Sequence, residues 1–520
     1  MDSKKILEYC IDRGLLLDPD VLNLFSETKD LESLKLIIEK IKKETSHRII
    51  TKGFFNKNKI QINNFFSELP EESRQKLERL KINLGLSIEI TKENSVMIKE
   101  KEPFSSTACE VKVSSADNCS GKKFSVEDFV KHFRARFLEM KKILQNRFEL
   151  TNLISINKVT GNRKGISVIG IILDKKTTKN KNILLEAEDL TGKIKVLVNQ
   201  NKPDVYNKAG EIALDSVIGF KGSASQDFFF ADEIFFPDSS ILERKKSPVE
   251  EHALFIGDVH IGSKLFLEKN FLRFIDYLNG KISDISSDVD KIKYLFVVGD
   301  LVAGVGVYPS QEKELEIKNL EEQFEKAAEL FGKIRSDIKI IISPGNHDGV
   351  RLMEPQPFLD KKYAKALYNL KNVIFTKNPS WVNIGSTKNF IGFNVFTYHG
   401  FSYPYYANNI PSLMKDYSLN APDKIMKYLL KNRHLAPTHA STQYFPSEEN
   451  GLMIKKVPDI FVSGHSHKCA VSYYNNILII SNASWEGKTS FQEKMGNEPD
   501  FCKVPMFNLK TRKIKILDFE

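Results

Sequence analysis

Residues 254–260 read Leu-Phe-Ile-Gly-Asp-Val-His, a short apolar run that ends in a glycine, an aspartate and a histidine. Four further apolar runs also end in polar side chains. They lead into Gly299-Asp300, Gly345-Asn346-His347-Asp348, His399-Gly400 and Gly464-His465-Ser466-His467. Runs of this length, rich in β-branched and aromatic residues and mostly closed by Gly or Pro, predict strands. Strands that deliver polar side chains at one edge predict a site at that edge.

The segments between the first three runs have helical spacing. Apolar residues repeat at intervals of three and four over 271–278 and again over 320–331. The order is therefore strand, helix, strand, helix, strand. This order predicts a layered α/β domain with its chemistry on the loops that follow the strands.

The five patches contain the ligand set of a two-metal phosphoesterase. They supply three Asp, one Asn and five of the ten His of the chain. Two divalent ions about 3.5 to 4 Å apart need a bridging oxygen ligand, and Asp300 is the candidate bridge. Imidazole and carboxylate ligands together favour Mn²⁺, with Fe, Zn or Mg as alternatives. We expect one ion to be held by Asp258, His260 and His467, and the other by Asn346, His399 and His465.

Such ions would polarise the phosphoryl oxygens and activate a water for in-line attack. His347 lies beside a predicted ligand without being needed as one, so we assign it a catalytic role. It would protonate the leaving oxygen or stabilise charge on the phosphate. A single Asp-x-His is also typical of a surface turn, whereas five patches in this order after predicted strands favour the metal site. His434 and His439, in a loop that contains Pro437, are interpreted as structural loop residues.

The order of the patches resembles that of the calcineurin-like metallophosphoesterases, a superfamily that includes double-strand-break-repair nucleases. Three flanks narrow the resemblance to the small subunits of archaeal D-family DNA polymerases. They are Gly-Asp-Leu-Val-Ala-Gly-Val-Gly-Val-Tyr-Pro at 299–309, Arg-His-Leu-Ala-Pro at 433–437 and Val-Pro-Asp-Ile-Phe at 457–461.

This resemblance implies a metal-dependent 3′→5′ exonuclease that proofreads for a separate large polymerase subunit. Its substrates would be single-stranded or mismatched 3′ ends of DNA, and the ligand roles would be those given above. Related small subunits of eukaryotic replicative polymerases have lost many of these ligands, whereas this chain keeps all of them.

The chain departs from the superfamily at Ala303. Many members carry an acid or a histidine there, three residues after the bridging aspartate, and its side chain orients the histidine of the Gly-Asn-His-Asp patch. We therefore expect metal binding to be retained here. The rate would depend on whether another group orients His347.

A second domain is predicted upstream of the phosphoesterase region. Five strand-like runs separated by Gly, Asn, Asp and Lys clusters predict a small barrel of the OB type. The runs are 167–173, 183–189, 193–198, 216–221 and 228–235. The basic stretch 175–181 is interpreted as a loop, and its Lys175, Lys176, Lys179 and Lys181 are candidates for contacts with single-stranded nucleic acid. Docking to a partner subunit is the alternative role of this barrel.

The other segments complete the organisation of a multidomain α/β protein. Apolar spacing predicts an amphipathic helix over 125–148, with a basic face that would meet DNA, a partner or solvent. A helix start at Asp18-Pro19-Asp20 indicates a helical module. The predicted parts are a helical docking module over 1–72, a flexible linker over 73–123, the lead-in helix and OB-type barrel over 124–245, and the layered phosphoesterase domain over 246–520.

Global composition agrees with this organisation. A chain of 520 residues with 41% hydrophobic residues suffices for several packed domains. Its net charge of +10, from 77 basic and 67 acidic residues, favours a polyanionic partner. Five Cys without a Cys-x-x-Cys pair argue against a zinc ribbon or a disulfide framework. Without a signal peptide or an apolar stretch of about 18 residues, we expect a cytoplasmic protein with no membrane segment.

Two alternatives to a proofreading exonuclease stay open. In one, the chain binds metal but mainly serves as a scaffold that stabilises the large polymerase subunit. In the other, it is a free-standing phosphodiesterase acting on small nucleotides, which leaves the helical and barrel domains without a role.

Overall fold

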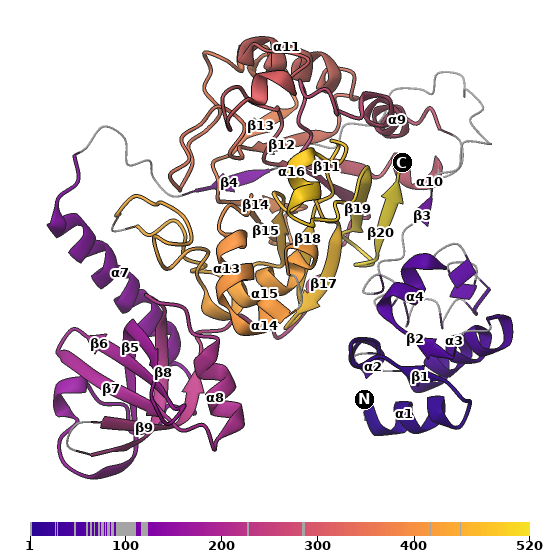
Figure 1. Ribbon diagram of the computed structural model, residues 1–520. Helices are drawn as coiled ribbons and strands as arrows, with labels where there is room; N and C mark the ends of the chain where they lie inside the picture. Colours follow the sequence, from indigo (N-terminus) through magenta and orange to yellow (C-terminus); the bar gives the residue numbers. More distant parts are fainter. Residues whose placement is uncertain are drawn as a thin grey trace.

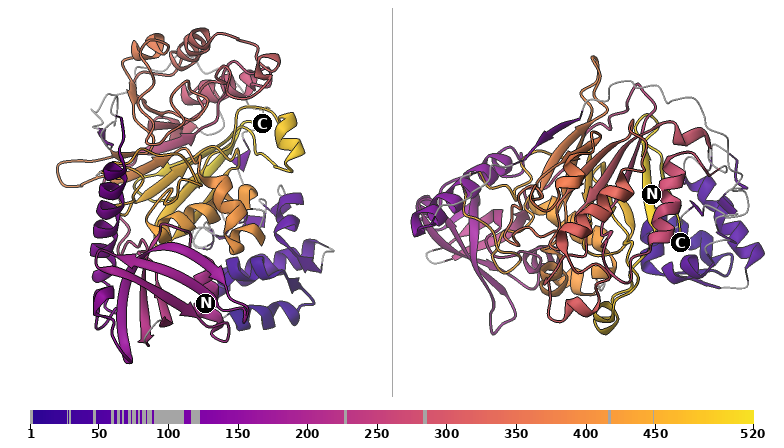
Figure 2. Two further views of the ribbon diagram at one scale, coloured as in Figure 1. Left: turned by 60° about the vertical axis from the view of Figure 1, so that its left-hand side comes forward. Right: turned by 90° about the horizontal axis from the view of Figure 1, so that it is seen from above.

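Three parts of the chain are distinguishable in the computed structural model: an N-terminal group of helices, a barrel joined to a long helix, and a large two-sheet domain (Figure 1). The structure describes residues 3–58 except 27, 29, 46 and 47, scattered residues between 61 and 89, residues 111–115, and residues 123–520 except 226, 227, 283–285, 416, 417 and 448. The view from above shows the barrel and the N-terminal helices on different sides of the large domain (Figure 2, right).

The first sheet of the large domain carries the predicted strand and helix alternation. Its strand order is β13-β12-β11-β10-β19-β20-β3, and the four strands β10 to β13 are parallel. The strands are β3 (Ile88–Glu89), β10 (His252–Ile256), β11 (Ile292–Val298), β12 (Lys339–Ser343), β13 (Val373–Phe375), β19 (Lys503–Asn508) and β20 (Ile514–Asp518). Helices α9 (Glu268–Leu278) and α11 (Leu320–Phe331) bury their apolar sides against the outer face of this sheet, with short helices α10 (Ser286–Val289) and α12 (Lys365–Tyr368) nearby.

A second sheet, which the sequence pattern did not reveal as a separate layer, stacks on the first. Its order is β17-β18-β16-β15-β14-β4. The strands are β4 (Lys112–Ser114), β14 (Ser380–Ile384), β15 (Phe393–Tyr398), β16 (Ile460–Ser463), β17 (Ala470–Tyr474) and β18 (Ile477–Ser481). Helices α13 (Tyr403–Asn409), α14 (Pro411–Lys415) and α15 (Pro422–Asn432) cover its outer face.

The core between the two sheets explains why the central strands are apolar throughout. In β11, Phe296 and Val298 face the second sheet, whereas Leu295 and Val297 face helices α9 and α11. Both faces of the strand are therefore buried, which favours continuous apolar runs over alternating ones. Because β10, β11 and β12 are parallel, as are β15 and β16, their carboxyl ends meet at one edge of the stack.

The upstream strands close into a five-stranded barrel of order β5-β6-β7-β9-β8. They are β5 (Arg163–Thr177), β6 (Ile183–Asp189), β7 (Gly192–Val198), β8 (Val217–Ala224) and β9 (Phe228–Phe235), with helix α8 (Pro203–Gly210) after β7. These are the five predicted runs. The loop prediction for 175–181 was wrong at its start, because β5 continues through Thr177 and pairs Lys175 and Lys176 with β6.

Helix α7 (Val126–Gln145) joins the barrel to the large domain and is capped by Ser125 and Asp128. Its apolar residues pack on the barrel and on Met453 of the large domain. Arg136, which belongs by spacing to the basic face predicted to meet DNA, a partner or solvent, is instead buried within this chain and is 1% exposed. Its guanidinium donates to the carbonyls of Pro437 and Asp215, since those carbonyls need partners at this junction.

The N-terminal part is helical where it is described. It contains α1 (Ser3–Ile11), α2 (Pro19–Ser26), α3 (Leu31–Glu44) and α4 (Lys52–Lys57), with β1 (Leu16–Leu17) paired to β2 (Ile49–Ile50). Helix α2 begins at Pro19, as the sequence predicted. No helix in the described part of the chain is both long and apolar enough to cross a membrane.

The predicted linker needs correction at two places. Strand β3 lies at one edge of the first sheet, beside β20, and β4 lies at one edge of the second sheet, beside β14. Strand β4 is held there because Val111 and Val113 pack into the core between the sheets. Most of the other residues of 73–123 lie outside those that the structure describes.

Candidate metal centre

The predicted ligands meet at the edge where the parallel strands end. Asp258 follows β10, Asp300 follows β11 and Asn346 follows β12 in the first sheet. His399 follows β15, and the patch with His465 and His467 follows β16, in the second sheet. The site therefore lies where the two layers meet, and each layer supplies part of it.

The backbone at this edge is folded around the ligands. Five of them have left-handed φ angles of 49° to 67°: Asp258, His260, Asp300, His465 and His467. This conformation is uncommon for residues other than glycine and concentrates at functional sites. Glycines make the room that the ligands fill. A Cβ on Gly299 would lie 2.1 Å from His399 Nδ1, and one on Gly345 would lie 2.2 Å from Asp300 Oδ1.

The donor atoms form overlapping groups suited to metal ions. Asp258, His260 and His467 make one group, and Asp300, His399 and His465 make another, with the donor atoms of each group within 4.8 Å of one another. A third group joins Asp300 to His260 and His347. Asp300 is thus shared between the two ends of the site, as a bridging carboxylate would be.

Hydrogen bonds with main-chain groups fix the orientation of the predicted ligand side chains. His399 donates from Nδ1 to the carbonyl of Val298 (3.2 Å), which turns Nε2 towards Asp300 Oδ2 (3.2 Å) and Asn346 Oδ1 (3.0 Å). The amide of His465 donates to both oxygens of Asp258 (2.9 Å each). Partners of this kind hold ligands in place before an ion binds.

Burial sets the charge state of the site. It raises the pKa of Asp258 well above its usual range and lowers the pKa of His465 to about 3 and that of His467 to about 4. At His399 burial opposes protonation, but the carboxylates of Asp300 and Asp258 outweigh it and raise the pKa to about 10. A proton on His399 and a cation at its Nε2 are alternative ways to balance these carboxylates, so metal binding would release that proton.

The residues fit a pair of divalent cations. The Nε2 atoms of His260 and His467 face each other at 3.1 Å, and burial lowers the pKa of both rings, so two neutral imidazoles converge at this end of the site. Mixed imidazole and carboxylate donors are those of Mn, Fe and Zn sites.

Comparisons with known proteins agree with this geometry. The calcineurin-like phosphoesterase family matches residues 252–469. The DNA polymerase II small subunit of Methanothermobacter thermautotrophicus is 37% identical over 413 residues, which cover 78% of this chain and 82% of the relative. The protein of the same name from Pyrococcus furiosus is 33% identical, over 87% of this chain and 73% of the relative.

This chain belongs to the family of archaeal DNA polymerase II small subunits. Its large domain is a calcineurin-like phosphoesterase domain.

The structure shows which group orients His347 in this small subunit. His347 donates from Nδ1 to the backbone carbonyl of Ala303 (2.7 Å). The same carbonyl accepts from Nε2 of Gln311 (2.8 Å), whose Oε1 accepts from the amide of Val307 (2.9 Å). A main-chain oxygen therefore takes the place of the missing side chain at position 303. The Nε2 atom of His347 lies 4.0 Å from Asp300 Oδ2, inside the site.

Sequence reasoning missed two further residues of this small subunit at the site. Glu486 lies 4.0 Å from His260, and burial raises its pKa to about 7. Gln492, in α16 (Ser490–Lys494), contacts Nδ1 of His467 at 2.8 Å. Both come from the segment after β18, another strand that ends at this edge. The apolar run 477–480 was therefore the available signal.

The four lysines predicted to contact nucleic acid on the barrel of the small subunit differ in their surroundings. Lys175 turns inward and donates to the carbonyls of Gly210 and Ile212 (2.8 Å each), and burial lowers its pKa. It is therefore a structural residue. Lys176 forms an ion pair with Asp174. Lys179 and Lys181 are exposed.

Proposed function

We propose that this small subunit is the proofreading 3′→5′ exonuclease of a DNA polymerase and that it hydrolyses phosphodiester bonds with two divalent cations, Mn²⁺ being favoured. The sharing of Asp300 between two groups of ligands carries this proposal, because a shared carboxylate is what two adjacent ions require. The seven predicted ligands are proposed as the set that holds the ions, with Asp258, His260 and His467 at one and Asn346, His399 and His465 at the other.

Bound cations would supply the charge that polarises the phosphoryl oxygens and positions the attacking water. The protein supplies the rest of the chemistry. The amide of Asn346 is a neutral ligand, so the site keeps enough positive charge to attract a phosphodiester. His347 is held by Ala303 with Nε2 towards the site. A proton at Nε2 would pass to the 3′ oxygen that leaves as the terminal nucleotide is released.

The other domains are assigned roles that suit a polymerase subunit. We infer that the OB-type barrel, α7 and the N-terminal helices serve assembly with the large catalytic subunit. Binding of DNA single strands by the barrel is the alternative, and the exposed Lys179 and Lys181 are its candidate contacts.

The test is degradation of DNA labelled at its 5′ end, single-stranded or with a mismatched 3′ end, by the full chain with Mn²⁺. We expect a ladder of products shortened from the 3′ end. Asp300→Asn and His347→Ala should abolish or greatly slow it, whereas Asp204→Asn, the same change as the first but on the exposed surface of α8, should not. Absence of degradation by the wild-type chain, alone or with its large subunit, would refute the catalytic proposal.

The same protein preparations distinguish the scaffold from the free-standing phosphodiesterase. A wild-type chain that binds Mn²⁺ but never shortens DNA, while it raises the stability of the large subunit, would be a scaffold. A chain recovered from native extract without any large polymerase subunit, and active on small nucleotides, would be a free-standing phosphodiesterase.

A further inference from the structure

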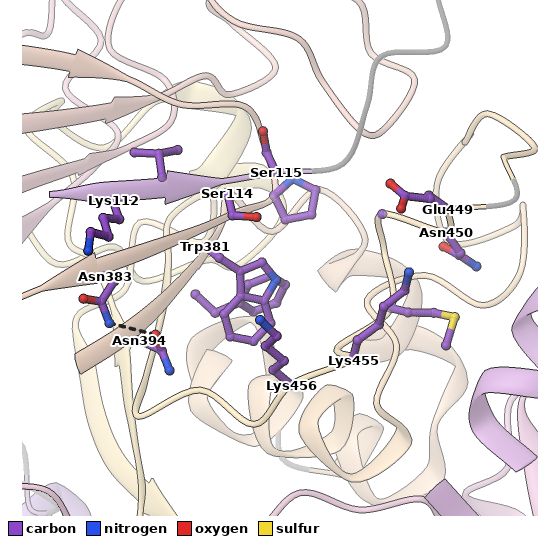
Figure 3. A pocket seen from close by; sticks show the side chains of 15 residues that line it. Lys112, Ser114, Ser115, Trp381, Asn383, Asn394, Glu449, Asn450, Lys455 and Lys456 are labelled. Carbon is purple, nitrogen blue, oxygen red and sulfur yellow. Dashed lines mark hydrogen bonds between the residues drawn. The ribbon is translucent and has the colours of Figure 1, made fainter. Parts of the chain in front are cut away.

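A pocket of about 320 Å³ lies on the outer face of the second sheet, at the edge made by β4 (Figure 3). Strands β4, β14 and β15 form its floor, and the segment 449–456 forms the facing wall. The pocket is separate from the metal ligands, none of which lines it.

The strand register arranges the floor in two rows. Ser114, Trp381 and Phe396 are paired across the three strands and form one row. Lys112, Asn383 and Asn394 form the next row in the same way. Paired residues project from the same face of a sheet, so the rows lie side by side on the outer face.

The two rows offer different contacts to a ligand. The indole of Trp381 is half-buried, and one side packs against the Phe396 ring with 4.4 Å between centroids. In the other row, Asn383 donates from Nδ2 to Asn394 Oδ1 (2.9 Å). A supported aromatic ring beside amide groups is the combination by which sheet surfaces stack a base and hydrogen-bond its edge.

The wall supplies positive charge. Lys455 and Lys456 are exposed and line the pocket. In the part of the chain that the structure describes, neither ammonium group has an ion-pair partner. Glu449 is the one acidic residue among those lining the pocket, and Lys455 and Lys456 outnumber it, so the balance is positive. Lys455 also lines a second, open hollow, which contains Arg147 and Arg433 and lies beside the barrel.

We propose that this pocket binds a segment of single-stranded nucleic acid, with a base on Trp381 and phosphates at Lys455 and Lys456. Charge complementarity and the ring together favour this ligand over an acidic polypeptide, which would need the lysines but not the indole. The proposal does not rest on the exonuclease activity. The pocket does adjoin the metal centre through Pro379, which lines it and follows Asn378, whose Oδ1 accepts from the amide of His399 (2.9 Å).

The chain offers a direct probe, because Trp381 is one of only two tryptophans. The other, Trp485, is 0% exposed and packs against Phe271 and Phe274. The full chain is titrated with a short oligothymidylate in EDTA, which prevents hydrolysis, and tryptophan fluorescence is recorded. Binding by wild type and each variant is also followed by anisotropy of labelled oligonucleotide over a range of salt concentrations.

We expect quenching in wild type and in Trp485→Phe, and none in Trp381→Phe. Trp381→Ala, which removes the ring, should bind at least about fivefold more weakly, the effect of losing one stacked base. Replacement of Lys455 and Lys456 by Glu should make the negative slope of log K against log salt shallower by about 1.4, since each phosphate contact contributes about 0.7 to its magnitude. If Trp485→Phe does not fold, the comparison of wild type with Trp381→Phe suffices, because Trp485 is buried.

The matched control reverses the charge of two exposed lysines on the layer of the first sheet, Lys269 and Lys371. Its net charge changes by the same amount, and we expect its salt slope to equal that of wild type. An equal fall in the control would overturn the proposal, because binding would then follow total charge. So would undiminished affinity in Trp381→Ala, or quenching by polyglutamate as strong as that by the oligonucleotide, which would identify an acidic polypeptide as the ligand.

Discussion

Gln311 provides a test of how His347 is aimed. The carbonyl of Ala303 lies between two donors, Nδ1 of His347 at 2.7 Å and Nε2 of Gln311 at 2.8 Å. Gln311 also fixes the amide of Val307 and is 2% exposed. Replacing it by leucine removes both contacts at nearly constant volume. The carbonyl then loses the group that holds it in line with His347.

The expected loss follows from the energies of these contacts. A neutral hydrogen bond contributes about 1 kcal/mol, and the Val307 amide left without a partner adds about 1 kcal/mol or more. If 1 to 2 kcal/mol of this appears as misalignment in the transition state, kcat falls by about fivefold to thirtyfold. His347→Ala, which removes the proton donor itself, should cost about 10²-fold to 10⁴-fold. The affinity for Mn²⁺ should not change in Gln311→Leu, because Gln311 contacts no ligand.

Asn372 serves as the control. It is buried and donates from Nδ2 to the carbonyl of Ile338 (3.1 Å), at the end of the first sheet away from the metal centre. Asn372→Leu should lower thermal stability because that carbonyl loses its donor, but it should leave kcat unchanged. The assay is exonuclease rate at saturating Mn²⁺ and DNA, with a melting temperature and a Mn²⁺ titration for each variant. Equal falls in kcat for the two variants, or a change of less than about twofold in Gln311→Leu, would refute the reasoning.

Three further outcomes are expected. Calorimetric titration with Mn²⁺ should show two sites in wild type and loss of both in Asp300→Asn, since Asp300 is grouped with His399 and His465 at one end of the site and with His260 at the other. Burial lowers the pKa of His132 in the folded chain to about 4, below its value of about 6.5 when unfolded. The free energy of unfolding should therefore fall by up to about 3 kcal/mol as pH drops from 6.5 to 4. Urea unfolding measured against pH should show this fall, and His132→Gln should remove it. Lys175→Met should lower the melting temperature because two carbonyls lose a donor, whereas the exposed Lys179→Met and Lys181→Met should leave it unchanged.

Much of the architecture could be predicted because the informative residues are contiguous. Each ligand patch directly follows an apolar run, so the position of Asp258 after β10 and of Asp300 after β11 can be read along the chain. The same holds for the barrel, whose five strands coincide with five runs between turn residues. The pairing of the large domain into two stacked sheets could not be predicted, since apolar runs buried on both faces do not reveal which layer they join.

Contacts between distant segments were not predictable from pattern. Arg136 belongs to a basic helix face by spacing, yet its burial depends on carbonyls 79 and 301 residues away. Lys175 belongs to a basic cluster, yet it is drawn inward by the end of α8. At position 303, an alanine in place of an acid or a histidine predicted that His347 lacks the side chain that would orient it. The carbonyl that replaces it is present at every residue and therefore leaves no trace in the sequence.

The left-handed backbone at five ligands has an energetic consequence. A non-glycine residue in this conformation costs about 1 to 2 kcal/mol, and glycine would recover up to about 1 kcal/mol at each position after its own entropy loss. Replacing Asp258 would also remove a carboxylate that burial disfavours. Replacement of these residues by glycine would therefore relieve backbone strain at each position. Under the proposed function, a small subunit that keeps all five residues retains this backbone strain in order to hold its ions.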